Sequence, residues 1–237
     1  MNIAELKRKL TTEETHDFDS LCLLVELLRS EEGCMWDREQ DHKSIRSDII
    51  EETYEVVEAI DKDDMTLLRE ELGDVLFQVM FHSQIEKEKG TFNINHVIGD
   101  VIDKMILRHP HVFGEVQVGS SGEILDNWDK IKTVEKSRLT LRETLEAVPK
   151  QYPALLRAKK VVKKARKGGL DITADENDLL RLAEELKTAQ DEDRAKLLTE
   201  IIFTSVVMSG EGDDVEKNLS YRVNEFIDSC AEKSEEK

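Results

Sequence analysis

The stretch from Ile49 to Phe81 constrains the fold of this chain most strongly, because two apolar segments at helical spacing carry acidic residues in their interiors. Glu52 and Glu55 lie three positions apart in the first segment, and Glu71 and Asp74 lie three apart in the second. Residues three or four apart share one face of an α-helix. If the two helices pack as an antiparallel hairpin, the two pairs of carboxylates meet between them.

Carboxylates gathered in an apolar setting need a counter-charge. The second segment is apolar around most of its circumference, with Leu72, Val75 and Leu76 around Asp74, so we expect this helix and Asp74 to be buried. Burying an unpaired charge is very costly, and the pattern therefore indicates a bound cation. The alternative is a solvated helix face, because 52 of the 237 residues are acidic and charge runs usually mark exposed surface. The pairing of the two segments and their expected burial favour the metal site.

Composition excludes several classes of function. The formal net charge of −18 argues against nucleic-acid binding, which needs Lys and Arg to neutralise phosphates. No stretch has the length of a transmembrane helix, and the first residues lack the apolar run of a signal peptide, so we expect a cytoplasmic protein with no membrane partner. Cys22, Cys34 and Cys230 are scattered and form no CxxC pair, which argues against zinc and disulfides.

The remaining sequence predicts an all-α protein. The chain has only three prolines, and its apolar residues recur three or four positions apart. Residues 1–16 are expected to form a peripheral leader, and the polar segment 31–44, which contains Trp36, a loop. A domain boundary is expected between Ala147 and Pro153. The helices are expected at residues 17–30, 45–61, 65–89, 95–108, 123–138, 155–166, 176–190, 192–208 and 214–231.

Two further patterns have a structural and a functional interpretation. His82 continues the helical stripe of Glu71 and Asp74, where a histidine is more often a satisfied core residue than a ligand. The segment from Leu155 to Arg166 is strongly basic. It could bind an acidic partner or, as the simpler interpretation, the acidic first half of this chain.

Five motifs resemble, in order, those of the MazG family of all-α nucleoside triphosphate pyrophosphohydrolases. The resemblance extends continuously from about Phe18 to Lys136, and it implies a homodimer that completes each helical bundle. The motifs are WDREQDH (Trp36 to His42), EETYE (Glu51 to Glu55), EELGD (Glu70 to Asp74), RHPHVFG (Arg108 to Gly114) and NWDKIK (Asn127 to Lys132).

The resemblance implies magnesium-dependent cleavage between the α and β phosphates of nucleoside triphosphates. Oxygen ligands are those that Mg²⁺ or Mn²⁺ prefers, and such an ion lowers the pKa of a bound water. Glu51 or Glu52 could orient or deprotonate that water, and Lys and Arg would stabilise charge on the leaving pyrophosphate. The implied metal ligands are Glu52, Glu55, Glu71 and Asp74, and the implied substrate-binding residues are Lys104, Arg108, Trp128, Lys132 and Trp36.

The second half of the chain resembles a degenerate copy of the first. We place the intact repeat at residues 17–140 and the degenerate one at 150–231, and we expect the latter to serve structure or dimerisation. Its first acidic helix keeps Glu184 and Glu185 but has Thr188 at the third position. Leu197 and Glu200 stand at the positions of Glu71 and Asp74, and Glu225 and Ser229 stand at those of Lys104 and Arg108.

Two other classes of protein compete with the enzyme. A nucleotide-binding regulatory module with little turnover would fit the degenerate repeat, although the carboxylate quartet argues against it. A di-iron bundle needs a Glu-x-x-His on each of two helices. Glu13 with His16 and Glu39 with His42 have that spacing, but both pairs fall in the expected leader and loop. Met35, where the family often has Pro, and Asp41, where it often has Thr, leave the choice of substrate open.

Overall fold

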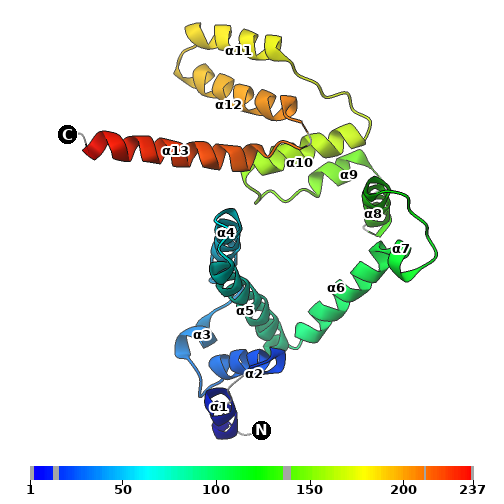
Figure 1. The fold of residues 1–237 in the computed structure, drawn as a ribbon, viewed down its shortest axis with the longest axis vertical. Helices are drawn as coiled ribbons and strands as arrows, with labels where there is room; N and C mark the ends of the chain where they lie inside the picture. The colour runs from blue at the N-terminus through cyan, green and yellow to red at the C-terminus, as the bar shows by residue number, and fades with distance from the viewer. Residues whose placement is uncertain (1–2, 13–15, 136–139, 211, 236–237) are drawn as a thin grey trace. The chain divides into compact units, whose positions relative to one another are not determined.

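The computed structural model describes residues 3–12, 16–135, 140–210 and 212–235. Every regular element within these ranges is a helix (Figure 1), which confirms the all-α prediction. The chain divides into two compact units, Met1–Ile124 and Leu125–Lys237, while the repeat boundaries given above stay a prediction. None of the helices described here combines the length and apolar character that a bilayer span requires.

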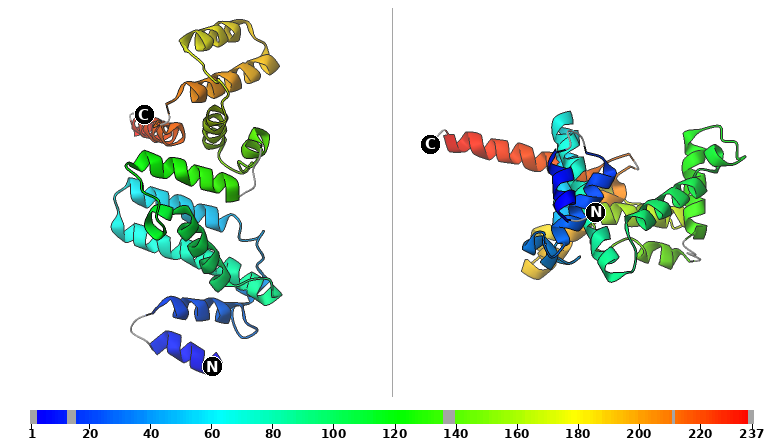
Figure 2. Two further views of the ribbon diagram at one scale, coloured as in Figure 1. Left: turned by 90° about the vertical axis from the view of Figure 1, so that its right-hand side faces the viewer. Right: turned by 90° about the horizontal axis from the view of Figure 1, so that it is seen from below.

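The first unit is built around a helical hairpin. Helices α4 and α5 run side by side (Figures 1 and 2), and α2 and α6 also contact α5. The core cluster joins Val25 of α2 and Ile45 to Met80, Phe81 and Ile85 of α5. The elements are α1 (Ile3–Thr12), α2 (Phe18–Arg29), α3 (Met35–Glu39), α4 (Asp48–Asp61), α5 (Met65–Lys89), α6 (Ile94–Arg108), α7 (Pro110–Phe113) and the start of α8 (Ser121–Glu135).

Local signals determine where the helices of this unit begin and end. The Asp17 carboxylate accepts a hydrogen bond from the Ser20 amide and caps α2, and Asp64 caps α5 in the same way. Such side chains satisfy amide groups that have no partner within the helix. Gly90 ends α5 with φ of 75°, a left-handed conformation that glycine adopts without steric cost. The hairpin that carries the four acidic residues is therefore bounded as the sequence predicts.

Two segments differ from the sequence-based expectation. Residues 3–12 form α1, which packs on α2, whereas a leader was expected there. Leu6, only 9% exposed, and Leu10 lie four positions apart and give this charged segment one apolar face. The expected loop 31–44 contains the short helix α3 (Met35–Glu39), which carries Trp36.

Arg29, at the end of α2, holds the segment that contains α3. Its guanidinium pairs with Glu88 of α5, with nitrogen–oxygen distances of 2.9 and 2.8 Å. The same group donates to the carbonyl oxygens of Asp37, at 2.6 Å, and Gln40, at 3.1 Å. Arg29 is buried, and its N–H groups donate hydrogen bonds to these oxygens. These bonds offset the cost of removing the guanidinium charge from water.

The second unit contains a comparable set of contacts. A helix ending in a basic turn, α10, precedes the hairpin of α11 and α12, and α10 contacts both α12 and α13. Arg166 of α10 donates to the carbonyl oxygens of Ile172, at 2.9 Å, and Val207, at 2.6 Å. It thus joins the following loop to the end of α12, as Arg29 joins its loop to α5. The elements are α9 (Leu141–Glu146), α10 (Ala154–Lys167), α11 (Glu176–Thr188), α12 (Asp191–Met208) and α13 (Val215–Glu235).

The turn after α2 leaves no room for a side chain at Gly33. A Cβ atom there would lie 2.0 Å from the Leu27 carbonyl oxygen and 2.4 Å from that of Leu28. Gly33→Ala is therefore expected to push this turn away from α2 and to lower the free energy of unfolding in urea by about 1–3 kcal/mol. Gly99→Ala is the control, because a Cβ in the middle of α6 meets nothing within 4 Å and should stabilise by about 0.5–1 kcal/mol. Equal effects of the two substitutions would contradict this account.

Candidate metal centre

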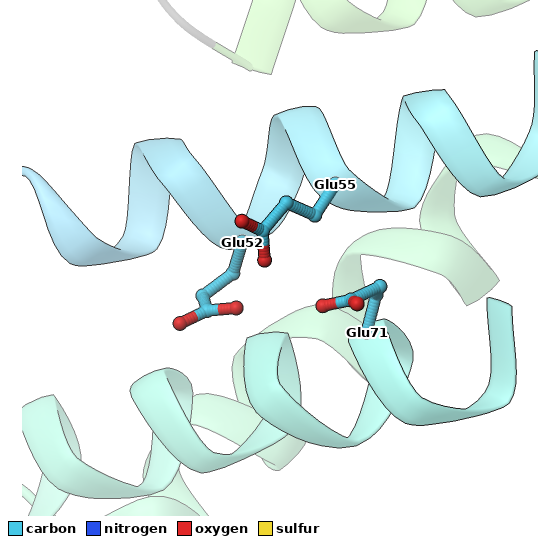
Figure 3. A group of neighbouring side chains, drawn as sticks. All are labelled: Glu52, Glu55 and Glu71. Carbon is cyan, nitrogen blue, oxygen red and sulfur yellow. The ribbon is translucent and has the colours of Figure 1, made fainter. Parts of the chain in front are cut away.

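Three carboxylates meet between α4 and α5. Glu52 and Glu55, one helical turn apart on α4, and Glu71 on α5 each place a carboxylate oxygen within 4.8 Å of the others. Figure 3 shows the three side chains directed into the space between the two helices. The i, i+3 spacing sets two of them on one face of α4, and the hairpin turn brings Glu71 opposite.

Two carboxylates of this cluster, Glu52 and Glu71, have raised pKa values. Burial, followed by the charges of Asp74 and Glu55, raises the pKa of Glu52 above its ordinary value. Burial, followed by the charge of Glu55 and a hydrogen bond with it, raises the pKa of Glu71, and Asp74 adds to the effect. Carboxylates close together resist ionising together. A hard divalent cation would remove this repulsion, and carboxylate oxygens are its preferred ligands. The donor set therefore fits such an ion.

Asp74 is close enough for its charge to act on both Glu52 and Glu71, but its environment differs from the prediction. The sequence predicts a helix buried all round, and Asp74 is exposed instead. Leu72 and Leu76 are also exposed, at 52% and 40%. Within this unit, α2, α4 and α6 contact α5, and these contacts leave Asp74 and the two leucines exposed. Glu71, by contrast, is only 7% exposed.

The other predicted residues of the first unit lie on three different helices. Glu51 is exposed on α4 and stands outside the group of three carboxylates. On α6, which packs against α5, Lys104 is half-buried and Arg108 is 7% exposed. Trp36 is 58% exposed on α3. The structure thus brings together Glu52, Glu55 and Glu71, with Asp74 beside them.

Trp128 and Lys132 lie on the part of α8 that belongs to the second unit. Both side chains are half-buried. Lys132 lines a cavity of about 780 Å³ within this unit. The basic residues of α10 line the same cavity, together with α8 and α9. The lysines involved are Lys130, Lys132, Lys160, Lys163, Lys164 and Lys167.

The carboxylates of the second hairpin have different partners. Glu184 pairs with Lys187 at 2.6 Å, and Glu185 pairs with Arg181 at 2.8 Å, both on their own helix. Glu200 is exposed on α12. Among the described residues of this hairpin, no three metal-ligating side chains converge as Glu52, Glu55 and Glu71 do.

A second polar cluster lies at the other end of α5, and sequence reasoning missed it. His42 and His82 approach through their Nδ1 atoms, at 2.8 Å, and His42 Nε2 lies 2.6 Å from Glu86 Oε1. His82 thus has a polar partner, as expected of a satisfied histidine. Forty positions separate His42 and His82, and no periodic pattern links them. Of the di-iron pairs considered above, Glu13 lies outside the described residues, and His42 faces His82 and Glu86.

These features define an all-α protein whose helical hairpin presents a cluster of carboxylates suited to a hard divalent cation. The chain belongs to the MazG family. The family model described as "MazG nucleotide pyrophosphohydrolase domain" matches residues 40–113, a range that spans α4, α5 and α6 and includes all four acidic residues, Lys104 and Arg108.

Three relatives illustrate this membership. The nucleoside triphosphate pyrophosphohydrolase/pyrophosphatase MazG of Thermotoga maritima is 40% identical over 196 residues, which are 81% of this chain and 75% of the relative. The nucleoside triphosphate pyrophosphohydrolase of Escherichia coli K12 is 41% identical over 159 residues, or 67% of this chain. The uncharacterized protein YabN of Bacillus subtilis is 44% identical over 148 residues, 62% of this chain and 30% of the relative. This chain spans 60% of the length of the Escherichia coli relative.

Proposed function

We propose that this chain hydrolyses nucleoside triphosphates to nucleoside monophosphates and pyrophosphate in the presence of Mg²⁺, with Mn²⁺ as a substitute. The convergence of Glu52, Glu55 and Glu71 carries the proposal, because the raised pKa values of Glu52 and Glu71 reflect burial and nearby negative charge, which a divalent cation would offset. The Thermotoga maritima and Escherichia coli relatives are named for hydrolysis of nucleoside triphosphates with pyrophosphate chemistry, which supports the same reaction class.

The proposed ligands of the ion are Glu52, Glu55, Glu71 and Asp74. When bound, the ion would supply a water of lowered pKa and neutralise phosphate oxygens. Glu51 or Glu52 would accept the proton of the water whose oxygen attacks the α phosphorus. The bond from that phosphorus to the bridging oxygen then breaks, and pyrophosphate leaves with the electron pair.

The substrate-binding residues remain part of the proposal. Lys104 and Arg108 lie four apart on α6, and α6 packs on α5. Both would stabilise negative charge on the leaving pyrophosphate. Trp36, Trp128 and Lys132 are proposed to contact the nucleotide. Trp36 is exposed on a segment that Arg29 holds at a defined place, which suits a ligand contact better than a role in covering the core.

We propose a structural role for the second repeat and a homodimer for the intact protein. Glu184 and Glu185 are each neutralised by a neighbour on the same helix, so they have no need of a metal. Around the carboxylate cluster, α4 and α5 leave several large apolar side chains exposed, and a second copy would remove these from water. They are Ile50, Tyr54, Val57, Ile60, Leu72 and Leu76. The proposed location is the cytoplasm, where nucleoside triphosphates are available, and no nucleic-acid partner is proposed.

Product analysis tests the reaction. The protein is incubated with each nucleoside triphosphate, with and without Mg²⁺, and the products are separated by ion-exchange chromatography. Monophosphate and pyrophosphate that appear only with Mg²⁺ are expected. If the products are diphosphate and phosphate instead, the protein is a hydrolase that cleaves a different phosphate bond. Nucleotide binding without turnover would favour the alternative function, a regulatory module, which the degenerate second repeat motivates.

A further inference from the structure

The His42–His82 contact joins two segments that are far apart in the sequence. His42 lies in the turns between α3 and α4, and His82 lies on α5. Their rings are nearly parallel and meet edge to edge, with centroids 5.0 Å apart and planes 18° apart. On its other side, His42 Nε2 meets Glu86 Oε1 at 2.6 Å. The three side chains thus form one continuous chain of hydrogen bonds from α5, through the inter-helix segment, and back to α5.

The geometry limits how many protons this chain can hold. Between two Nδ1 atoms at 2.8 Å, one nitrogen must donate and the other must accept. With both rings neutral, His42 donates Nε2–H to Glu86, and His82 donates Nδ1–H to the bare Nδ1 of His42. One added proton is compatible with the bond, because a single imidazolium still faces a bare nitrogen. A second proton places N–H against N–H, and the bond is lost.

The charged groups around the pair come from three segments. Glu86, on α5, is held as an anion, since hydrogen bonds from Lys89, Thr91 and His42 lower its pKa to about 2. Lys89 Nζ lies 2.7 Å from the same Glu86 oxygen that meets His42.

On the other segments, the charge of Asp48, at the start of α4, tends to raise the pKa of His82. The neighbouring His42 tends to lower the pKa of Asp41 in the turn. Lys43, next to His42, also lowers the pKa of Asp41. The anions of these segments and Glu86 therefore surround a pair of rings that are in direct contact.

We propose that His42, His82 and Glu86 form a proton-controlled latch that holds residues 40–47 against α5 and opens when both imidazoles are protonated. This segment leads directly into α4, which carries Glu52 and Glu55. Ile45 of the same segment is buried in the core, and Arg29 holds its first residue, Gln40. The latch thus lies between the attachment of Gln40 to Arg29 and the burial of Ile45, and its strength depends on pH.

The direction of the pH effect follows from His82. Burial, then the neighbouring His42, lowers the pKa of His82 below its ordinary value of 6.5, while Asp48 opposes the shift. The folded protein therefore binds fewer protons here than the unfolded chain does. The stabilisation is complete above the ordinary histidine pKa and is lost as pH falls through the lowered value. Glu86 stays ionised throughout this range.

Nitrogen NMR of the imidazoles tests the latch without a substrate or metal. Long-range ¹H–¹⁵N correlation spectra, recorded from about pH 8 to about pH 5 and assigned with His42→Phe and His82→Phe, report which nitrogen of each ring carries the proton. At the upper pH we expect a proton on Nδ1 of one ring of the pair, facing a bare Nδ1 of the other. Two rings protonated on Nε2 alone would overturn the proposal.

Thermal unfolding over the same pH range gives an independent readout. The wild-type melting temperature is expected to fall by several degrees on acidification below about pH 6.5. His82→Phe keeps an aromatic ring at this position but should lose most of this dependence. His96→Gln, which removes a histidine from the α6 cap, is the matched control and should keep the wild-type slope. Identical slopes for all three proteins would overturn the latch, and the NMR result decides it if His82→Phe fails to fold.

Discussion

Asp74→Ala is expected to lower Mg²⁺-dependent hydrolysis of nucleoside triphosphates by about 100-fold or more, a loss comparable to removing one group that stabilises the transition state. Asp74 is exposed, and its charge acts on Glu52 across the hairpin and on Glu71 of its own helix. Its removal therefore weakens the proposed ion site with little loss of packing. The measurement is steady-state release of pyrophosphate over a range of Mg²⁺ concentrations, with circular dichroism to verify the helical content.

Glu200→Ala is the matched control for Asp74→Ala. Glu200 stands at the equivalent position of the second repeat, and it is also an exposed carboxylate on the second helix of a hairpin. Because no partner carboxylates converge there among the described residues, turnover should change by less than about twofold, in line with a surface substitution. Similar losses in both variants would contradict the assignment of the reaction to the first repeat.

Glu71→Gln is expected to raise the melting temperature of the metal-free protein while abolishing turnover. Glutamine has nearly the same shape as glutamate but cannot ionise, so it removes the cost of burying a charge and the repulsion with Glu55 and Asp74, which together raise the Glu71 pKa. In the wild-type protein, Mg²⁺ at about 100 times its dissociation constant should add about 2.7 kcal/mol of stability. The variant should lose most of this gain. Both effects are measured by scanning calorimetry with EDTA or with Mg²⁺.

The pH dependence of the metal-free protein checks the same cause. An acid whose pKa is raised by folding binds more protons in the folded state, so its stabilisation is present at low pH and is lost as pH rises through the raised value. For Glu52 and Glu71 this loss begins above the ordinary value of 4.5. Glu70→Gln, which removes an exposed charge one residue earlier on α5 that contributes least to the raised pKa of Glu71, should keep most of the wild-type loss. A melting temperature of Glu71→Gln below that of the metal-free wild type would show that repulsion does not dominate the cluster.

Much of the first unit can be predicted from local sequence. Asp17, Asp64 and Gly90 mark helix ends because a cap or a left-handed residue acts on the backbone within one turn. The i, i+3 spacing places Glu52 and Glu55 on one face, and a three-residue connection forces α5 back along α4. The meeting of these carboxylates with Glu71 therefore depends on short-range geometry.

Other features depend on contacts between distant residues. The exposure of Asp74 depends on which elements cover α5. An apolar pattern indicates that a surface tends to be buried, but it does not identify the element that covers it. Arg29 with Glu88, and His42 with His82, pair across long stretches of chain because the core brings α2, the inter-helix segment and α5 together. Helix boundaries follow from residues within one or two turns of each other, and the carboxylate cluster follows from helical spacing and one short connection. Burial, the anchoring of the Trp36 segment and the histidine latch arise only where separate helices pack.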